Sequence, residues 1–139
     1  MFYFCPKLTV QFGSRILLVE DSRVNQVFAA ELLKTLNCSV EIAENGVVAL
    51  EKYRTGAYDL ILMDCMMPEM DGYEATAAIR EEEETKAKGH IPIVALTANA
   101  LDGDREKCLD AGMDDYIAKP AKRAQVEQML SRHLHLQAA

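Results

Sequence analysis

Four short apolar runs in this chain each end at a polar residue. The runs are Ile16–Val19, Leu60–Met63, Ile91–Leu96 and Tyr116–Ala118, and the residues that follow them are Glu20-Asp21, Asp64, Thr97 and Lys119. Short apolar runs without polar–apolar alternation are typical of strands buried on both faces, as in a parallel sheet. We therefore predict four buried parallel strands.

The segment Ser39–Ala43 differs from these runs because its polar and apolar residues alternate. Alternation predicts a half-solvated strand, which suits the edge of a sheet. Segments with helical periodicity lie between the strands. The first begins after Ser22, a good N-cap residue. Its apolar stripe consists of Val24, Val27, Phe28, Leu32, Leu33 and Leu36.

Caps and apolar spacing also predict the next two helices. One runs from a cap at Asn45 to about Arg54 and ends at Gly56. The other follows the loop that ends at Gly72, and its inward-facing residues are predicted to be Tyr73, Ala77 and Ile79. Its far end carries Glu81–Glu84. We expect these acids to form a solvated, fraying end because negative charge there opposes the helix dipole.

Two further helices complete the chain. A weak one, from about Gly103 to Ala111, has few apolar anchors, namely Leu101, Cys108 and Leu109. The last helix has a clear apolar stripe made of Val126, Met129, Leu130 and Leu134. Five strand–helix units in one chain predict an α/β fold.

The predicted architecture is a three-layer α/β/α sandwich around a five-stranded parallel sheet, a flavodoxin-like fold. Right-handed crossovers and an edge position for Ser39–Ala43 are both satisfied by the strand order 2-1-3-4-5. This order makes the first and third strands neighbours. Ligands of open parallel sheets bind beyond the carboxyl ends of the strands where the order reverses. Glu20, Asp21 and Asp64 are therefore expected to meet in that crevice.

Length and charge limit the classes of function. The 139 residues fit one domain, which we assign to residues 14–139, with residues 1–13 as an N-terminal extension or linker. The formal net charge of -7 opposes direct binding to nucleic acid or to an anionic membrane. No apolar stretch is long enough to span a bilayer, so we expect no membrane insertion of this segment. We expect a cytoplasmic domain, whose parent protein could still be anchored in a membrane.

The four cysteines form no CxxC pair, and no histidine lies at metal-ligand spacing from them. They are expected to be packing thiols in a reducing compartment. Cys65 lies beside the predicted crevice, but no sequence feature requires a redox role for it.

Clustered carboxylates repel one another unless a cation lies among them. Mg²⁺ prefers one or two carboxylates together with water and phosphate oxygens. Asp21 and Asp64 suit direct ligation, Glu20 suits contact through water, and the backbone carbonyl of Met66 could complete the ligand set. Each acid alone is explained as well by a capping role. Three uncompensated acids at adjacent strand ends would instead cost stability.

Phosphoryl transfer is the chemistry that this set of side chains permits. Asp64 is the candidate nucleophile, because a carboxylate can attack phosphorus and form an acyl phosphate. Lys119 could pair with one phosphoryl oxygen, and the hydroxyl of Thr97 could donate to another. Tyr116 is either an ordinary packing residue or part of a switch, in which its ring moves into space that Thr97 vacates.

With these residues placed, the chain resembles the receiver domain of two-component signalling proteins over about Ser14 to Leu136. The matching motifs are Ile16–Asp21, Leu62–Gly72, Ile93–Ala98 and Gly112–Pro120. The resemblance implies that Asp64 accepts a phosphoryl group from a histidine kinase or a histidine phosphotransfer protein, and that Glu20 and Asp21 serve Mg²⁺. It also implies a switch made of Thr97, Tyr116 and Lys119.

Two segments resemble receivers fused to hybrid sensor histidine kinases, namely Val24–Gln26 and Leu96–Leu101. The chain is therefore predicted to be the C-terminal receiver of such a kinase, with a stand-alone response regulator as the alternative. In the hybrid case a histidine phosphotransfer domain would dock over the pocket and the exposed face of the first helix. Met66 and Asn99 would flank the path of the hydrolytic water.

Three other functions are alternatives to a role in phosphorelay signalling. An aspartate-nucleophile phosphohydrolase usually has a general acid two residues after its nucleophile, where this chain has Met66. A flavodoxin-like cofactor binder needs a phosphate-binding loop after the first strand, and the acids of Glu20–Arg23 would repel a phosphate there. A purely structural interaction domain would lack affinity for Mg²⁺.

Overall fold

Five parallel strands form a sheet in the order β2-β1-β3-β4-β5. The computed structural model describes residues 14–65, 70–97, 104–119 and 121–134. The strands are β1 (Arg15–Val19), β2 (Ser39–Ala43), β3 (Leu60–Asp64), β4 (Ile93–Thr97) and β5 (Asp115–Ala118). The predicted strand order is confirmed, including the edge position of Ser39–Ala43.

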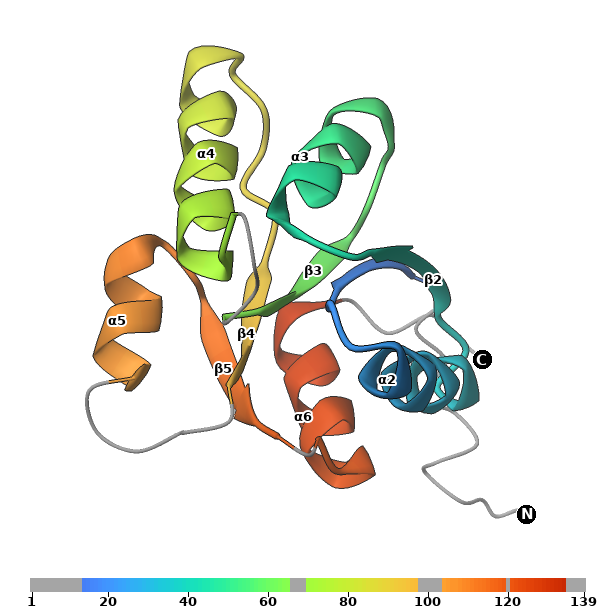
Figure 1. Cartoon of the computed structure of the whole chain (residues 1–139). Coiled ribbons are helices and arrows are strands. Elements are labelled where there is room, and N and C mark those ends of the chain that lie inside the picture. Colours follow the sequence, from blue (N-terminus) through green and yellow to red (C-terminus); the bar gives the residue numbers. More distant parts are fainter. Residues whose placement is uncertain (1–13, 66–69, 98–103, 120, 135–139) are drawn as a thin grey trace.

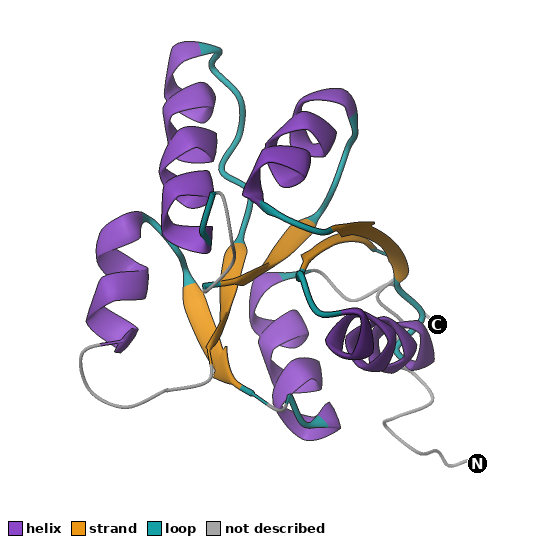
Figure 2. Ribbon diagram, viewed as in Figure 1, coloured by secondary structure: helices purple, strands orange, loops and turns teal. Residues whose placement is uncertain are grey.

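Helices cover both faces of this sheet (Figures 1 and 2). One face carries α2 (Arg23–Thr35) and α6 (Arg123–His133), and the other carries α3 (Gly46–Thr55), α4 (Gly72–Thr85) and α5 (Asp104–Ala111). The three-layer α/β/α sandwich is therefore confirmed. Among the described helices, none has both the length and the apolar character needed to cross a bilayer.

The strands are apolar on both faces because each face has its own core. In β1, Leu17 and Val19 pack into the core under α3, α4 and α5. Their neighbours Ile16 and Leu18 pack into the core under α2 and α6. All four side chains are fully buried. This arrangement explains why the central strands show no polar–apolar alternation.

The predicted boundaries agree closely with the structure. The strand Ser39–Ala43 has its predicted bounds, and the run Leu60–Met63 forms a strand that also includes Asp64. The apolar run that starts at Ile91 becomes a strand only at Ile93. The helix predicted from about Gly103 begins at Asp104 within the described residues. Its expected anchor Leu101 and the segment 1–13 lie outside them, so the division at residue 13 stays a prediction.

Side-chain caps begin three of the helices. The Ser22 hydroxyl accepts the Asn25 N–H at 3.4 Å, and the Asn45 side chain accepts the Val48 N–H at 2.9 Å. At the start of α4, Asp71 and Glu74 each accept the backbone N–H of the other in a capping box. These bonds satisfy amide groups that a helix start leaves without intrahelical partners. The caps predicted at Ser22 and Asn45 are confirmed.

The apolar stripe of α2 is wider than the part that the sheet covers. Leu33 and Leu36 are buried, but the exposed fractions of Val24, Val27 and Phe28 are 76%, 55% and 54%. These three residues lie in the first two turns of α2, directly after the carboxyl end of β1. The helix begins beyond the carboxyl end of β1, where little of the sheet remains to cover the apolar side of its first turns. The stripe therefore continues onto the surface.

Two predictions for α4 are wrong. Ala77 is exposed, and the inward position beside Ile79 is taken by Ala75. Glu82 and Glu83, expected to be solvated, are each only 8% exposed.

Basic partners explain why these two acids are buried. Arg54 lies 2.6 Å from Glu82, and Arg80 lies 2.9 Å from Glu83. Arg80 also binds Asp114 and the carbonyl oxygens of residues 91 and 112. A buried carboxylate is tolerated when it is paired and hydrogen-bonded in this way.

The two C-terminal helices differ in how firmly they are anchored. Cys108 is buried in α5, but Leu109, expected as a second anchor, is 45% exposed. In α6, Val126, Met129 and Leu130 are buried as predicted. Leu134 directly follows the last residue of this helix and is partly buried.

Candidate functional site

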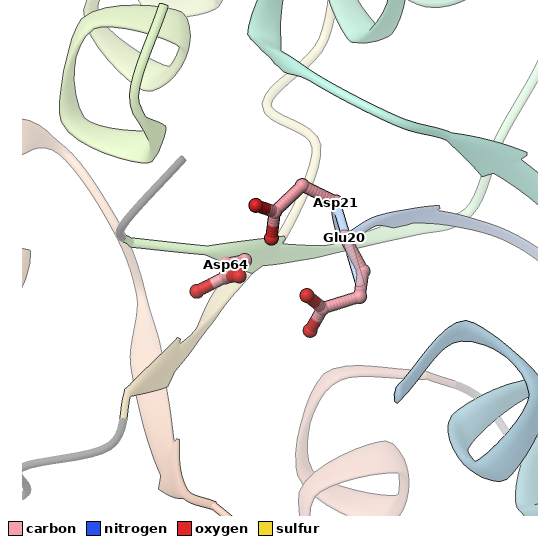
Figure 3. A group of neighbouring side chains, drawn as sticks. All are labelled: Glu20, Asp21 and Asp64. Atoms are coloured by element: carbon pink, nitrogen blue, oxygen red, sulfur yellow. The ribbon is translucent and has the colours of Figure 1, made fainter. Parts of the chain in front are cut away.

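Three carboxylates meet at the carboxyl ends of β1 and β3. Glu20, Asp21 and Asp64 each place an oxygen within 4.8 Å of the others. Figure 3 shows the three side chains grouped around one space beyond the strand ends. Glu20 and Asp64 are only 1% and 3% exposed, whereas Asp21 is exposed to solvent. The predicted convergence of the three acids is confirmed.

The backbone fixes Glu20 before its side chain takes part in any chemistry. The Glu20 N–H donates to the carbonyl of Ala43 at 2.9 Å, which continues the pairing of β1 with β2. Its carbonyl accepts the side-chain amide of Gln26 at 2.7 Å. One carboxylate oxygen accepts the Ser22 N–H at 3.1 Å. The orientation of the carboxylate is therefore set before any ligand binds.

Asp64 is the last residue of β3, and a close approach by α4 fixes its position. A Cβ atom on Gly72, the first residue of α4, would lie 2.3 Å from the carbonyl oxygen of Asp64. The Gly72 N–H donates to the carbonyl of Cys65 at 3.2 Å. Only glycine allows the helix to begin this close to the strand end. The local sequence predicts a helix after Gly72, but nothing in it indicates this contact.

Lys119 lies between the two buried acids. Its Nζ atom is 3.1 Å from Glu20 Oε1 and 3.1 Å from Asp64 Oδ2. Burial alone would lower the pKa of the Lys119 ammonium, but hydrogen bonds to Asp64 and Glu20 outweigh it and raise that pKa. The lysine is therefore held in its charged form inside the acidic cluster.

Thr97 and Tyr116 occupy the next two strands. Thr97 ends β4, is 4% exposed, and accepts the backbone N–H of Lys119 at its carbonyl, at 2.8 Å. Tyr116 pairs with Ala95 in the register of β4 and β5, and its partly buried ring packs against the core beneath α5. These positions are compatible with the predicted switch. Met66 and Asn99 lie outside the described residues.

The charge and donor types of the site suit a hard divalent cation. Three carboxylates and one ammonium leave two formal negative charges among the described site residues. The candidate metal ligands are the carboxylate oxygens of Glu20, Asp21 and Asp64. Mg²⁺ and Ca²⁺ prefer oxygen ligands over nitrogen or sulfur ligands. The residues therefore fit a magnesium ion.

Comparison with known proteins identifies the family. The sequence model of one protein family, the response regulator receiver domain, matches residues 16–131, which make up most of the chain. This chain is a member of the response regulator receiver domain family. The receiver fold and the resemblance inferred from the sequence motifs are confirmed.

The relatives of this receiver domain include hybrid kinases. Hybrid signal transduction histidine kinase B of Dictyostelium discoideum is 49% identical over 130 residues, which cover 87% of this chain and 7% of that protein. The receiver domain thus spans a small part of such a relative.

Two solved receiver domains have the same fold. The receiver domain of a Pseudomonas aeruginosa sensor histidine kinase, which has a magnesium ion in its active-site cleft, is 49% identical with a TM-score of 0.78. The aligned region covers 87% of this chain and 97% of that one. The receiver domain of Saccharomyces cerevisiae Ssk1, solved in complex with the histidine phosphotransfer protein Ypd1, is 31% identical with a TM-score of 0.82. Its alignment covers 91% of this chain and 92% of that one.

Proposed function

We propose that this receiver domain accepts a phosphoryl group on Asp64 from a phosphohistidine, with Mg²⁺ bound by the neighbouring acids. The observation that supports this most directly is the position of Asp64, which is buried beside Glu20 and Asp21 with the Lys119 ammonium 3.1 Å away. A carboxylate in this setting is pre-positioned against cationic groups that can neutralise a phosphoryl group.

The proposed reaction exchanges one bond to phosphorus for another. An oxygen of Asp64 attacks the phosphorus of the phosphohistidine, an oxygen–phosphorus bond forms, and the bond between phosphorus and the imidazole nitrogen breaks. The electron pair of that bond stays on the imidazole. Lys119 would leave Glu20 and pair with a phosphoryl oxygen, and the Thr97 hydroxyl would donate to another. The product is an aspartyl phosphate, which water later hydrolyses.

Glu20, Asp21 and Asp64 would hold the magnesium ion, with the backbone carbonyl of Met66 as a further expected ligand. When bound, the ion would neutralise charge on the phosphoryl oxygens and help to hold the donor in line. The chain's own contribution is to keep the acids in place, which the hydrogen bonds of Glu20 and the close packing of Gly72 achieve.

The proposed output is a change in the surface around α5 and β5. Thr97 would move towards the phosphoryl group, and the ring of Tyr116 would follow into the space left behind. The weak anchoring of α5 supports this proposal, because Leu109 is 45% exposed and Cys108 is the buried residue among Arg105–Ala111. Segments with few buried contacts rearrange at low cost.

The apolar surface of α2 supports a histidine phosphotransfer protein as the partner. A groove of about 670 Å³ on this helix is lined by Val24, Val27 and Phe28 together with polar residues. Phe28 also lines a second cavity, of about 300 Å³, whose walls include Glu20 and Lys119. An apolar surface therefore leads directly to the acidic site. A helical partner docked there could bring its histidine side chain to Asp64, either to donate or to receive the phosphoryl group.

The similarity to hybrid kinases supports a parent protein of that type, in which this receiver would take its phosphoryl group from the kinase core and pass it to a phosphotransfer protein. A stand-alone response regulator is the alternative. Either parent would use the same chemistry at Asp64.

Phosphotransfer from a loaded histidine phosphotransfer protein tests the proposal. With Mg²⁺ present, radioactive phosphate should move from the donor to this chain until about one phosphate per chain is bound or the donor is exhausted. Removal of Mg²⁺ with a chelator should stop the transfer, because the acids would then repel the incoming phosphate.

The matched variants are Asp64→Asn and Asp59→Asn. Asp59 precedes β3, is exposed, and accepts the Arg15 N–H at the opposite end of the sheet. The Asp59 variant should accept phosphate as the unmodified chain does, and the Asp64 variant should accept none. Equal labelling of the two variants would show that Asp64 is not the acceptor.

A further inference from the structure

The structure brings two cysteines together beside the acidic site. The sulfur atoms of Cys65 and Cys108 are 3.8 Å apart, although the residues are separated by 43 positions in the sequence. Each residue is only 1% exposed, and both belong to the core under α3, α4 and α5. Neither sulfur is in a disulfide in this structure.

The separation of the sulfur atoms is close to what a disulfide requires. A disulfide bond is about 2.05 Å long, so the two atoms would have to approach by roughly 1.8 Å. A rotation of one side chain, or a small shift of the helix that carries it, supplies a movement of that size. The third described cysteine, Cys38, lies in the core on the other face of the sheet and cannot compete for either sulfur.

The two residues differ in how firmly the backbone holds them. Cys65 follows Asp64, its N–H donates to the carbonyl of Leu96 at 3.1 Å, and its carbonyl accepts the Gly72 N–H. Cys108 lies in the short helix α5 (Asp104–Ala111). It is the buried residue of Arg105–Ala111, so any movement of α5 away from the core carries it along. Local opening of α5 would therefore expose the Cys108 thiol to a small oxidant and uncover the side of the Cys65 thiol that contacts it.

We propose that Cys65 and Cys108 form a reversible disulfide under oxidising conditions, and that this disulfide fixes α5 against the end of β3 and opposes the response to phosphorylation. The pairing of the cysteines is independent of the proposed function. The effect on the response rests on it, because α5 and β5 form the surface proposed to change.

A hydroperoxide is the class of oxidant that this step needs. The peroxide oxidises one thiol to a sulfenic acid, its oxygen–oxygen bond breaks, and an alcohol or water leaves. The second thiol's sulfur then attacks the sulfenic sulfur, a sulfur–sulfur bond forms, and water leaves. The two cysteines together lose two electrons and two protons, and the peroxide gains them. A dithiol reductant reverses the reaction by exchange.

Mass spectrometry of the chain after treatment with hydrogen peroxide tests the pairing. The chain has four cysteines, so the number of thiols that react with an alkylating agent in denaturant should fall from four to two. Digestion should yield one linked peptide pair that contains Cys65 and Cys108, and a dithiol should abolish it. The pairing is refuted if both cysteines are still thiols at a peroxide concentration that oxidises Cys38.

The matched variants are Cys108→Ser and Cys38→Ser. The first should lose the linked peptides, and the second should keep them. Because the primary measurement uses the unmodified chain, it stays decisive even if either variant folds poorly.

Amide chemical shifts near Tyr116 test the effect on the response. Beryllofluoride with Mg²⁺, a mimic of the phosphoryl group, should shift these signals in the reduced chain, and the change should fall by at least half in the oxidised chain. Equal changes in the two forms would refute a regulatory role for the disulfide. Absence of any change in the reduced chain would instead refute the proposed function, and the linked peptides would still decide the pairing.

Discussion

The close contact between Gly72 and the end of β3 predicts a large effect for a single methyl group. In Gly72→Ala, the new Cβ atom would lie 2.3 Å from the carbonyl oxygen of Asp64 and 3.0 Å from Cys65 Cα. Both neighbours belong to the backbone, so neither can swing away as a side chain does. The start of α4 would have to retreat from the strand by about 1 Å to restore an ordinary contact, which is the kind of strain that overpacking produces.

The expected loss of stability is about 2 kcal/mol. Forcing an extra methyl group into a packed site costs roughly 1–3 kcal/mol. The hydrogen bond from the Gly72 N–H to the carbonyl of Cys65 is 3.2 Å long, and its loss would add about 1 kcal/mol. The higher helix propensity of alanine offsets at most about 1 kcal/mol of this loss of stability, because Gly72 is the first residue of α4 and not an interior one.

Gly89→Ala is the matched control, because no heavy atom lies within 4 Å of the position of its added Cβ atom. Urea denaturation should give a free energy of unfolding about 2 kcal/mol lower for Gly72→Ala, and a change within about 0.5 kcal/mol for Gly89→Ala. Phosphorylation of Asp64 should also slow by about tenfold or more in the Gly72 variant, since a displacement of about 1 Å at a reacting group is costly. Equal stability of the two variants would refute the argument that the glycine is required by contact with Asp64.

Three other variants test separate parts of the molecule. Lys119→Met leaves the buried carboxylates of Glu20 and Asp64 without a cation, so the free energy of unfolding should fall by about 3 kcal/mol. Denaturation with and without Mg²⁺ should show that the ion restores part of this loss. A loss of stability that Mg²⁺ does not change would contradict the charge balance assigned to the site. Glu82→Gln removes the ion pairs of Glu82 with Arg54 and Lys86. In the unmodified chain, burial raises the pKa of the Glu82 carboxyl, but hydrogen bonds from these two partners outweigh it and lower that pKa below its usual 4.5. The resulting loss of stability, about 0.5–1 kcal/mol near pH 7, should therefore vanish as the pH falls through the lowered pKa, whereas the exposed control Glu81→Gln should show little change at either pH. Phe28→Ala should weaken the binding of a histidine phosphotransfer protein by about tenfold in calorimetry, without changing phosphorylation by acetyl phosphate. The control is Val47→Ala, at an exposed apolar residue on α3. A similar loss of binding affinity in that control would argue against docking at α2.

The strands and their order could be predicted because burial on both faces leaves a clear mark in the sequence. Uninterrupted apolar runs indicated the central strands, and the alternation in Ser39–Ala43 indicated an edge. Once the order was known, the meeting of Glu20, Asp21 and Asp64 followed from the geometry of parallel strands. The meeting of these three acids was therefore predictable residue by residue. The predicted ligand Met66 lies outside the described residues.

Features that depend on partners distant in the sequence could not be predicted in the same way. Glu82 is buried because Arg54, 28 positions away, binds it. Cys65 and Cys108 meet across 43 positions. The exposure of Phe28 depends on where the sheet stops beneath α2, which periodicity alone does not indicate. In each case the local pattern is the same whether or not the distant partner is present.

Locating the phosphorylated residue tests the central claim most directly. The chain should be treated with acetyl phosphate and Mg²⁺, reduced with borohydride to convert an aspartyl phosphate into a stable alcohol, digested, and analysed by mass spectrometry. The proposed chemistry predicts reduction at Asp64 in the sample that received both reagents, and none when Mg²⁺ is omitted. Reduction at Glu20, Asp21 or a distant acid, or an equal yield without Mg²⁺, would contradict it.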